Sequence, residues 1–144
     1  MAVLDVFLSP KIKKGKAHLR NLAQMALADG KIDDAEYEFL QDIAAKYGVS
    51  ANEVDKLITI GITKKDFSQE KSIKKFEQIF DLVKMMMVDN NINANELSMC
   101  KKFAQKIGFA VNKVDELIDS IKMNISLGNS MEETQLRVAY LIKD

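Results

Sequence analysis

The fold is decided by residues 22–58, LAQMALADGKIDDAEYEFLQDIAAKYGVSANEVDKLI, read beside residues 82–118, LVKMMMVDNNINANELSMCKKFAQKIGFAVNKVDELI. The second stretch aligns with the first without a gap, sixty positions further along the chain. Self-similarity at one fixed offset is the sequence signature of a duplicated structural unit. The residues that recur are Leu22, Met25, Asp29, Ile32, Glu36, Ala44, Lys46, Gly48, Asn52, Val54, Asp55, Leu57 and Ile58, as Leu82, Met85, Asp89, Ile92, Glu96, Ala104, Lys106, Gly108, Asn112, Val114, Asp115, Leu117 and Ile118.

Apolar residues within each copy follow a helical period. Leu19, Leu22, Ala23, Ala26 and Leu27 share one helix face, and no stretch alternates as a half-buried strand does. The pattern predicts helices near residues 11–28, 34–47, 51–60, 72–88, 94–107, 111–125 and 131–143. The predicted fold is therefore all-α, a compact bundle of about seven helices formed by two pseudo-symmetric three-helix repeats plus a C-terminal helix.

The domain organisation follows from the repeat. We expect residues 1–144 to form a single helical domain with internal repeats at 11–61 and 72–125, joined by the polar, lysine-rich stretch 61–71. The C-terminal helix has a broad apolar face, so we expect it to dock across the two copies.

Helix ends are also marked in the sequence. Four pairs fit the capping-box pattern, in which a polar residue is followed three positions later by glutamate: Asp33 with Glu36, Ser50 with Glu53, Asn93 with Glu96, and Ser130 with Glu133. Gly48 and Gly108 stand where a left-handed C-terminal cap is expected.

Composition excludes several classes of function. Lys+Arg and Asp+Glu both number 21, so no global field attracts nucleic acid or an anionic membrane. The single cysteine, Cys100, stands on the apolar face of its helix and is expected to be buried and inert. His18 is the only histidine, and no nucleophile motif accompanies it, so we expect no enzyme. The N-terminal residues do not resemble a secretory signal, and no apolar run is long enough to span a bilayer. We expect a cytoplasmic protein.

The acidic turn DGKIDDAE, Asp29 to Glu36, is the most informative motif. Its second half fits an EF-hand calcium loop, because Gly30 takes the sharp turn and Glu36 lands on the bidentate position. The first half does not fit, since Met25 and Leu27 stand where the first two carboxylate ligands belong. The second copy, DNNINANE from residue 89 to 96, replaces Gly30 by Asn90 and Asp33 by Asn93 and carries less charge.

Two interpretations of this turn remain open. In one, its carboxylates bind a divalent cation weakly, calcium or magnesium. In the other, the same residues are only helix caps, each contributing about 1 kcal/mol, with Ile32 and Ile92 filling the core.

The string ALADGKIDDAEYEFLQDIAAKYGVS, residues 26–50, resembles the signature of the TerB-like family, which is named for tellurite-resistance proteins. The resemblance covers nearly the whole chain, because that family is also a seven-helix, internally pseudo-symmetric bundle. It implies a module of tellurite resistance and stress response without enzymatic activity, whose acidic residues are suspected metal ligands. At matching positions these are Asp29, Asp33, Glu36, Asp89 and Glu96. Related domains precede a J-domain in membrane-anchored co-chaperones, but this chain lacks the His-Pro-Asp sequence of a J-domain.

Two function hypotheses follow. The first is a TerB-like stress-response module that binds a divalent cation through the acidic turns. The alternative is a purely structural interaction domain, in which the turns are caps and a helix face recruits a protein partner. A membrane-associated protein would fit the role of that partner. Neither involves nucleic acid.

Overall fold

The computed structural model describes residues 10–64, 72–88 and 92–142, which form eight helices and no strand. This confirms the predicted all-α class. By its internal contacts the chain divides into two compact units, Met1–Asp66 and Phe67–Asp144. The repeat predicted at 11–61 falls within the first unit and the one predicted at 72–125 within the second, and each unit is described by itself.

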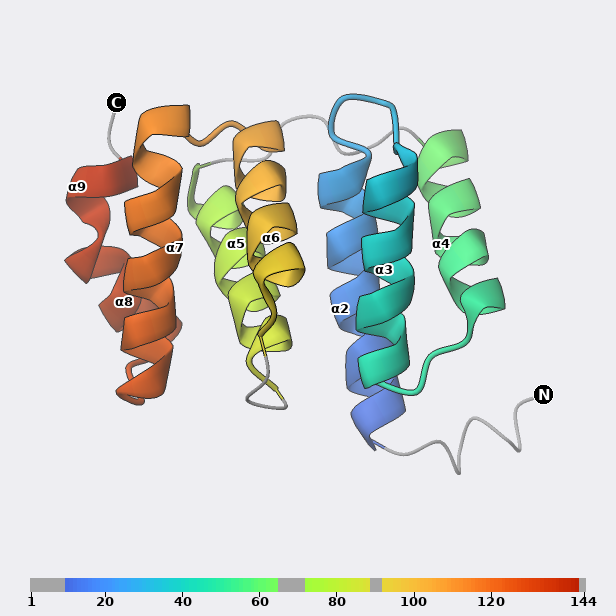
Figure 1. Ribbon diagram of the computed structural model, residues 1–144, viewed down its shortest axis with the longest axis horizontal. Helices are drawn as coiled ribbons and strands as arrows, with labels where there is room; N and C mark the ends of the chain where they lie inside the picture. The colour runs from blue at the N-terminus through green and yellow to red at the C-terminus, as the bar shows by residue number, and fades with distance from the viewer. Residues whose placement is uncertain (1–9, 65–71, 89–91, 143–144) are drawn as a thin grey trace. The chain divides into compact units, whose positions relative to one another are not determined.

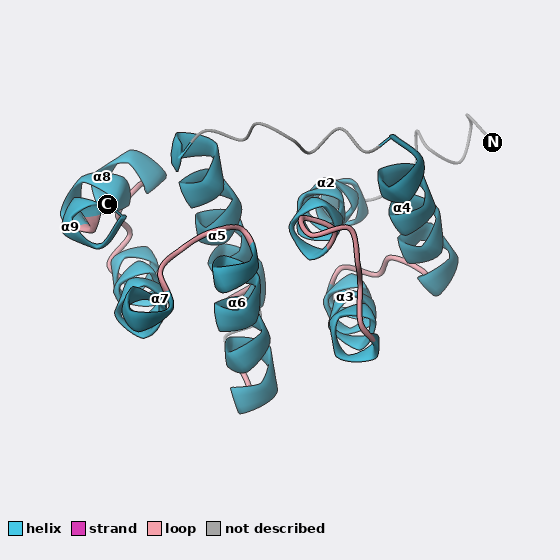
Figure 2. Ribbon diagram, turned by 90° about the horizontal axis from the view of Figure 1, so that it is seen from above, coloured by secondary structure: helices cyan, strands magenta, loops and turns pink. Residues whose placement is uncertain are grey.

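Unit 1 is a three-helix bundle of α2 (Pro10–Ala26), α3 (Asp34–Lys46) and α4 (Ala51–Lys64). Each helix contacts the other two, and the end-on view in Figure 2 shows them at the corners of a triangle. Their apolar faces meet in a core that excludes water almost completely. Its largest members are Leu19, Leu22, Met25, Phe39, Leu40 and Ile43.

Unit 2 consists of α5 (Ser72–Met86), α6 (Ala94–Lys106), α7 (Val111–Ser126), α8 (Met131–Arg137) and α9 (Ala139–Ile142). The helices α5, α6 and α7 pack together, α8 contacts α5 and α7, and α9 contacts α7 (Figure 1). The core includes Phe76, Ile79, Leu82, Phe103, Leu117 and Ile121. The C-terminal helices therefore seal the core of their own unit.

The C-terminal segment differs from the prediction, because the expected helix 131–143 is two helices. Val138 leaves helical geometry at φ −102° and ψ 10°, and its N–H donates to the carbonyls of Leu136 and Thr134. Both Val138 and Leu141 are buried.

The predicted helix ends are largely confirmed. Gly48 has φ +73°, its N–H donates to Ala45 O, and the N–H of Val49 donates to Ala44 O, which is the Schellman arrangement. Gly108, at φ +115°, ends α6 in the same way. Capping boxes are complete at Asp33 and at Ser130. At Ser50 the Oγ accepts the N–H of Glu53 at 3.3 Å.

The predicted burial of Cys100 is also confirmed. Cys100 is completely buried, and burial raises the pKa of its thiol far above the ordinary value. Met85 and Met86 are completely buried, while Met87 is half-buried. Residues 1–9 and most of the expected connection, 65–71, lie outside the described residues.

Candidate functional site

The acidic turn begins with a tight reversal after α2. Gly30 has φ +84°, a conformation that L side chains rarely adopt, and its N–H donates to Leu27 O at 2.8 Å. The N–H of Lys31 donates to Asp29 Oδ1 at 3.0 Å. One oxygen of the Asp29 carboxylate is therefore used to shape the turn itself.

Asp33 and Glu36 form the capping box of α3. The N–H of Glu36 donates to Asp33 Oδ1 at 2.8 Å, and the N–H of Asp33 donates to Glu36 Oε1 at 2.9 Å. Asp33 is exposed, whereas Glu36 is only 2% exposed. The geometry confirms that both residues cap the helix, and it assigns one oxygen of each carboxylate to the backbone.

The second acidic turn is described only in part, because Asp89 lies outside the described residues. Glu96 is 5% exposed, and its N–H donates to Asn93 Oδ1 at 2.7 Å. The return bond comes from the Asn93 side chain, whose Nδ2 donates to Glu96 Oε1 at 2.9 Å. This cap thus differs from the one at Asp33, where the backbone N–H is the returning donor.

Four of the five predicted metal ligands, all except Asp89, lie within the described residues. Within residues 10–64, 72–88 and 92–142, no three His, Cys, Asp or Glu side chains are grouped so that they could hold a metal ion. A cation at the acidic turns stays a prediction.

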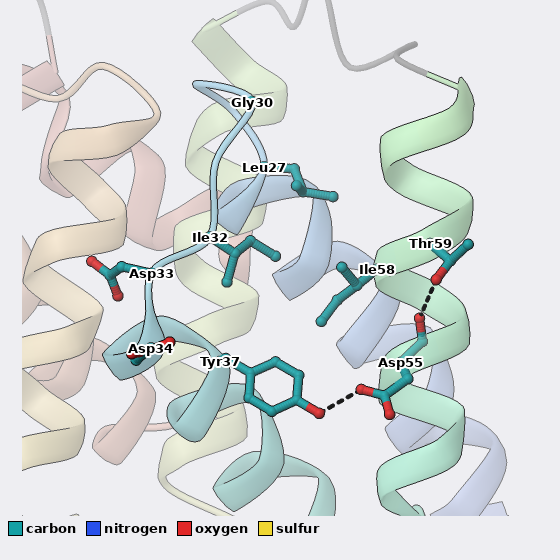
Figure 3. Close-up of a pocket in the computed structure, with 9 residues that line it drawn as sticks. All are labelled: Leu27, Gly30, Ile32, Asp33, Asp34, Tyr37, Asp55, Ile58 and Thr59. Carbon is teal, nitrogen blue, oxygen red and sulfur yellow. Dashed lines mark hydrogen bonds between the residues drawn. The ribbon is translucent and has the colours of Figure 1, made fainter.

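Beside the first turn lies a groove of about 420 Å³ between the start of α3 and one face of α4. We call it the unit 1 groove. Figure 3 shows the residues of the turn and of α3 along one side and those of α4 along the other. Its lining residues are Leu27, Gly30, Ile32, Asp33, Asp34, Tyr37, Asp55, Ile58 and Thr59. Three are carboxylates, three are large aliphatic residues, and none is basic.

A hydrogen bond crosses the groove from α3 to α4, in which the Tyr37 hydroxyl donates to Asp55 Oδ1 (Figure 3). The pKa of Tyr37 is raised from its ordinary value, first because the phenol donates this bond to a carboxylate. Thr59 Oγ1 donates to Asp55 O at 2.9 Å, within α4. Tyr37 is 37% exposed and Asp55 is exposed, so both are accessible to a ligand.

The corresponding aspartate in unit 2 has a different partner. Asp115, sixty positions after Asp55, accepts the ammonium of Lys101 at 2.9 Å, and this bond raises the pKa of Lys101. Lys101 stands where unit 1 has Gln41, and Leu97 stands where unit 1 has Tyr37. In unit 2 a lysine of the chain itself neutralises the aspartate.

Sequence reasoning missed Tyr37 and Asp55 as site residues. Asp55 was visible as a recurring residue, but no local motif joins it to Tyr37, eighteen positions earlier. The usable signal was the contrast between the copies: Asp55 and Asp115 recur, while Gln41 and Lys101 differ in charge.

Three comparisons with known proteins leave the family open. No family model, no curated protein and no solved structure matches this chain significantly. Among the described residues, no helix is both long enough and apolar enough to cross a membrane.

Proposed function

We propose that this protein is a non-enzymatic binding module whose unit 1 groove holds a positively charged, partly apolar segment of a partner protein. The observation that carries the proposal is the lining of the groove, which combines three carboxylates with aliphatic side chains and, among the residues that the structure describes, contains no basic one. The resemblance of residues 26–50 to the TerB-like family supports a cytoplasmic module of stress response, built from a duplicated three-helix unit.

The chemistry of the groove selects the class of occupant. Asp34 and Asp55 are exposed carboxylates on facing elements, so a cationic ligand is attracted and an anionic one is repelled. Leu27, Ile32 and Ile58 give the groove apolar walls, which favour a ligand that also carries aliphatic surface. A basic amphipathic helix has both properties on one side, because its lysine and arginine stems are themselves apolar.

The test is binding of a labelled amphipathic helical peptide made of leucine and lysine, measured by fluorescence anisotropy. We expect Asp34→Asn with Asp55→Asn to weaken binding by roughly tenfold, because two exposed charge pairs are lost. The wild-type affinity falls as salt is added, since exposed charge pairs are screened.

The matched control removes the same charge elsewhere. Asp42 and Glu77 are exposed and do not line the groove, so Asp42→Asn with Glu77→Gln should leave the affinity near that of the wild type. An equal loss of peptide affinity in both double variants would mean that net charge alone attracts the peptide, and the groove proposal would fail.

A divalent cation at the acidic turn is the second candidate function. It rests on one or two of the groove carboxylates rather than on a group of three, because magnesium keeps several of its waters and needs only one or two carboxylates from the protein. Asp29 and Glu36 of the first turn, with Asp89 and Glu96 of the second, are the further candidate ligands.

Isothermal titration of chelator-treated protein with calcium, magnesium, manganese and zinc tests this candidate. Heat that disappears in Asp29→Asn with Glu36→Gln locates the cation at the turn, and heat that disappears only in Asp34→Asn with Asp55→Asn locates it in the groove. No heat from the wild type with any of the four ions rejects the cation function. The helical content of each variant, from circular dichroism, shows whether the fold is preserved.

A further inference from the structure

We infer that the partner's anchoring group in the unit 1 groove is an arginine side chain, whose guanidinium binds Asp55 and stacks on the ring of Tyr37. This inference rests on the proposed function, and it names the chemistry that the groove selects.

The walls of the groove supply the three kinds of surface that an arginine uses. Asp34 comes from the first turn of α3 and Asp55 from α4, while the Tyr37 ring reaches across from α3 to α4 (Figure 3). Leu27 and Ile58 stand beside them and can cover the methylene stem of the side chain.

Arginine fits this arrangement better than lysine does. The guanidinium is planar and presents five donors in a fixed fork, so it can bond to the Asp55 carboxylate through more than one N–H while its flat face stays free. Its flat face stacks on an aromatic ring, as the exposed Tyr37 allows, whereas an ammonium acts as a compact point charge.

Unit 2 shows that an aspartate at this position accepts a cation. Asp115 binds the Lys101 ammonium at 2.9 Å, and Lys101 comes from the neighbouring helix of the same chain. In unit 1 the equivalent helix position is Gln41, and the neutral phenol of Tyr37 bonds to Asp55 instead. A guanidinium from a partner would form with Asp55 the charge pair that Lys101 forms with Asp115 in unit 2.

Binding of arginine also changes the state of Tyr37. A guanidinium on Asp55 offsets the carboxylate charge and competes with the phenol for its acceptor, which removes the main cause of the raised pKa. Tyr37 should therefore ionise at a lower pH in the complex than in the free protein. Arginine keeps its charge throughout an alkaline titration of tyrosine. The change is measured as tyrosinate absorbance, taken as the difference between the wild type and Tyr37→Phe because the chain has two other tyrosines.

The experiment compares two labelled leucine-based peptides of equal length and charge, one with only arginine as its basic residue and one with only lysine. We expect the arginine peptide to bind the full-length protein roughly fivefold more tightly, the size of one cation–π contact. In Tyr37→Leu this preference disappears. In Tyr37→Phe it remains, because the ring is kept and only the hydroxyl is lost.

Each outcome separates the inference from the proposed function. Equal binding of both peptides, sensitive to Asp34→Asn with Asp55→Asn, overturns the arginine anchor and leaves the basic-segment groove in place. Binding of neither peptide overturns both. An arginine preference that survives in Tyr37→Leu shows that the Tyr37 ring does not select the ligand and also overturns the inference.

Discussion

Gly15 in α2 and Tyr47 at the end of α3 approach so closely that no side chain fits between them. A Cβ placed on residue 15 would lie 2.3 Å from the Cβ of Tyr47 and 2.8 Å from its Cγ. Tyr47 is buried, and its ring also lies 5.4 Å from that of His18. Glycine at this position therefore lets the backbone of α2 pack directly against the side chain of Tyr47.

Gly15→Ala should destabilise unit 1, although alanine is the better helix former by about 1 kcal/mol. The blocking atom is a Cβ, which cannot move without its backbone, so the overpacking cost of about 1–3 kcal/mol exceeds that gain. Urea unfolding followed by circular dichroism measures the difference. A variant more stable than the wild type would show that the helices do not approach in this way.

Asp33→Ala should cost about 1 kcal/mol of unfolding free energy, because it removes the acceptor for the Glu36 N–H. Asp33→Asn should cost little, since asparagine caps as well as aspartate and Asn93 does so at α6. Urea unfolding of the two variants separates the contribution of the capping hydrogen bond to stability from that of the carboxylate charge. A large loss in Asp33→Asn would mean that the charge of the carboxylate stabilises the fold beyond its role as a cap.

The helices could be predicted from the sequence because their ends carry local signals. Apolar periodicity and the caps at Asp33, Gly48 and Gly108 act within a few residues, and the observed helices follow them closely. The break at Val138 could not be predicted, because the apolar pattern continues through it and no glycine or proline stands there.

The groove was less predictable than the helices for a physical reason. Asp33 and Asp34 belong to a recognisable turn, but Asp55 reaches the same groove only because α4 packs beside α3. The partner of a carboxylate depends on such tertiary contacts, and a single substitution at the neighbouring position changes it, as Gln41 and Lys101 illustrate.

Stability should fall at alkaline pH because of Cys100. The unfolded chain loses its thiol proton above about pH 8.5, whereas the buried thiol in unit 2 keeps it, since burial raises its pKa. Unfolding then releases a proton, and the free energy of unfolding decreases by up to about 1.4 kcal/mol per pH unit from this group. Below pH 8.5 the thiol is protonated in both states and contributes no slope.

The control for this pH dependence is Cys100→Ala, which lacks the thiol but keeps the other titrating groups. Its stability should fall less steeply than that of the wild type between pH 8.5 and 10. Equal pH slopes of the unfolding free energy in the two proteins would contradict the assignment of this effect to Cys100.

In the native protein, an aromatic disulfide reagent should react with Cys100 only as fast as unit 2 opens, because the thiol is fully buried.

Gln41→Lys should block cation binding in the unit 1 groove, because it places on α3 a lysine equivalent to Lys101 of α6. Gln41 lies within reach of the Tyr37 hydroxyl, and Lys101 at the equivalent position binds Asp115 at 2.9 Å. The new ammonium should therefore bind Asp55 and compete with any incoming cation.

We expect Gln41→Lys to weaken binding of the arginine peptide by roughly tenfold, comparable to loss of the groove carboxylates, with no loss of helical content. The matched control is Gln105→Lys, which adds the same charge at an exposed position of unit 2 and should leave the affinity nearly unchanged. Should both variants bind equally well, Asp55 would not be the acceptor for the ligand. In unit 2, Lys101→Gln removes the ammonium that pairs with the exposed Asp115 and supplies no ring equivalent to that of Tyr37, because Leu97 stands at that position. That variant should gain affinity for lysine and arginine peptides alike, which would separate the contribution of the carboxylate from that of the ring.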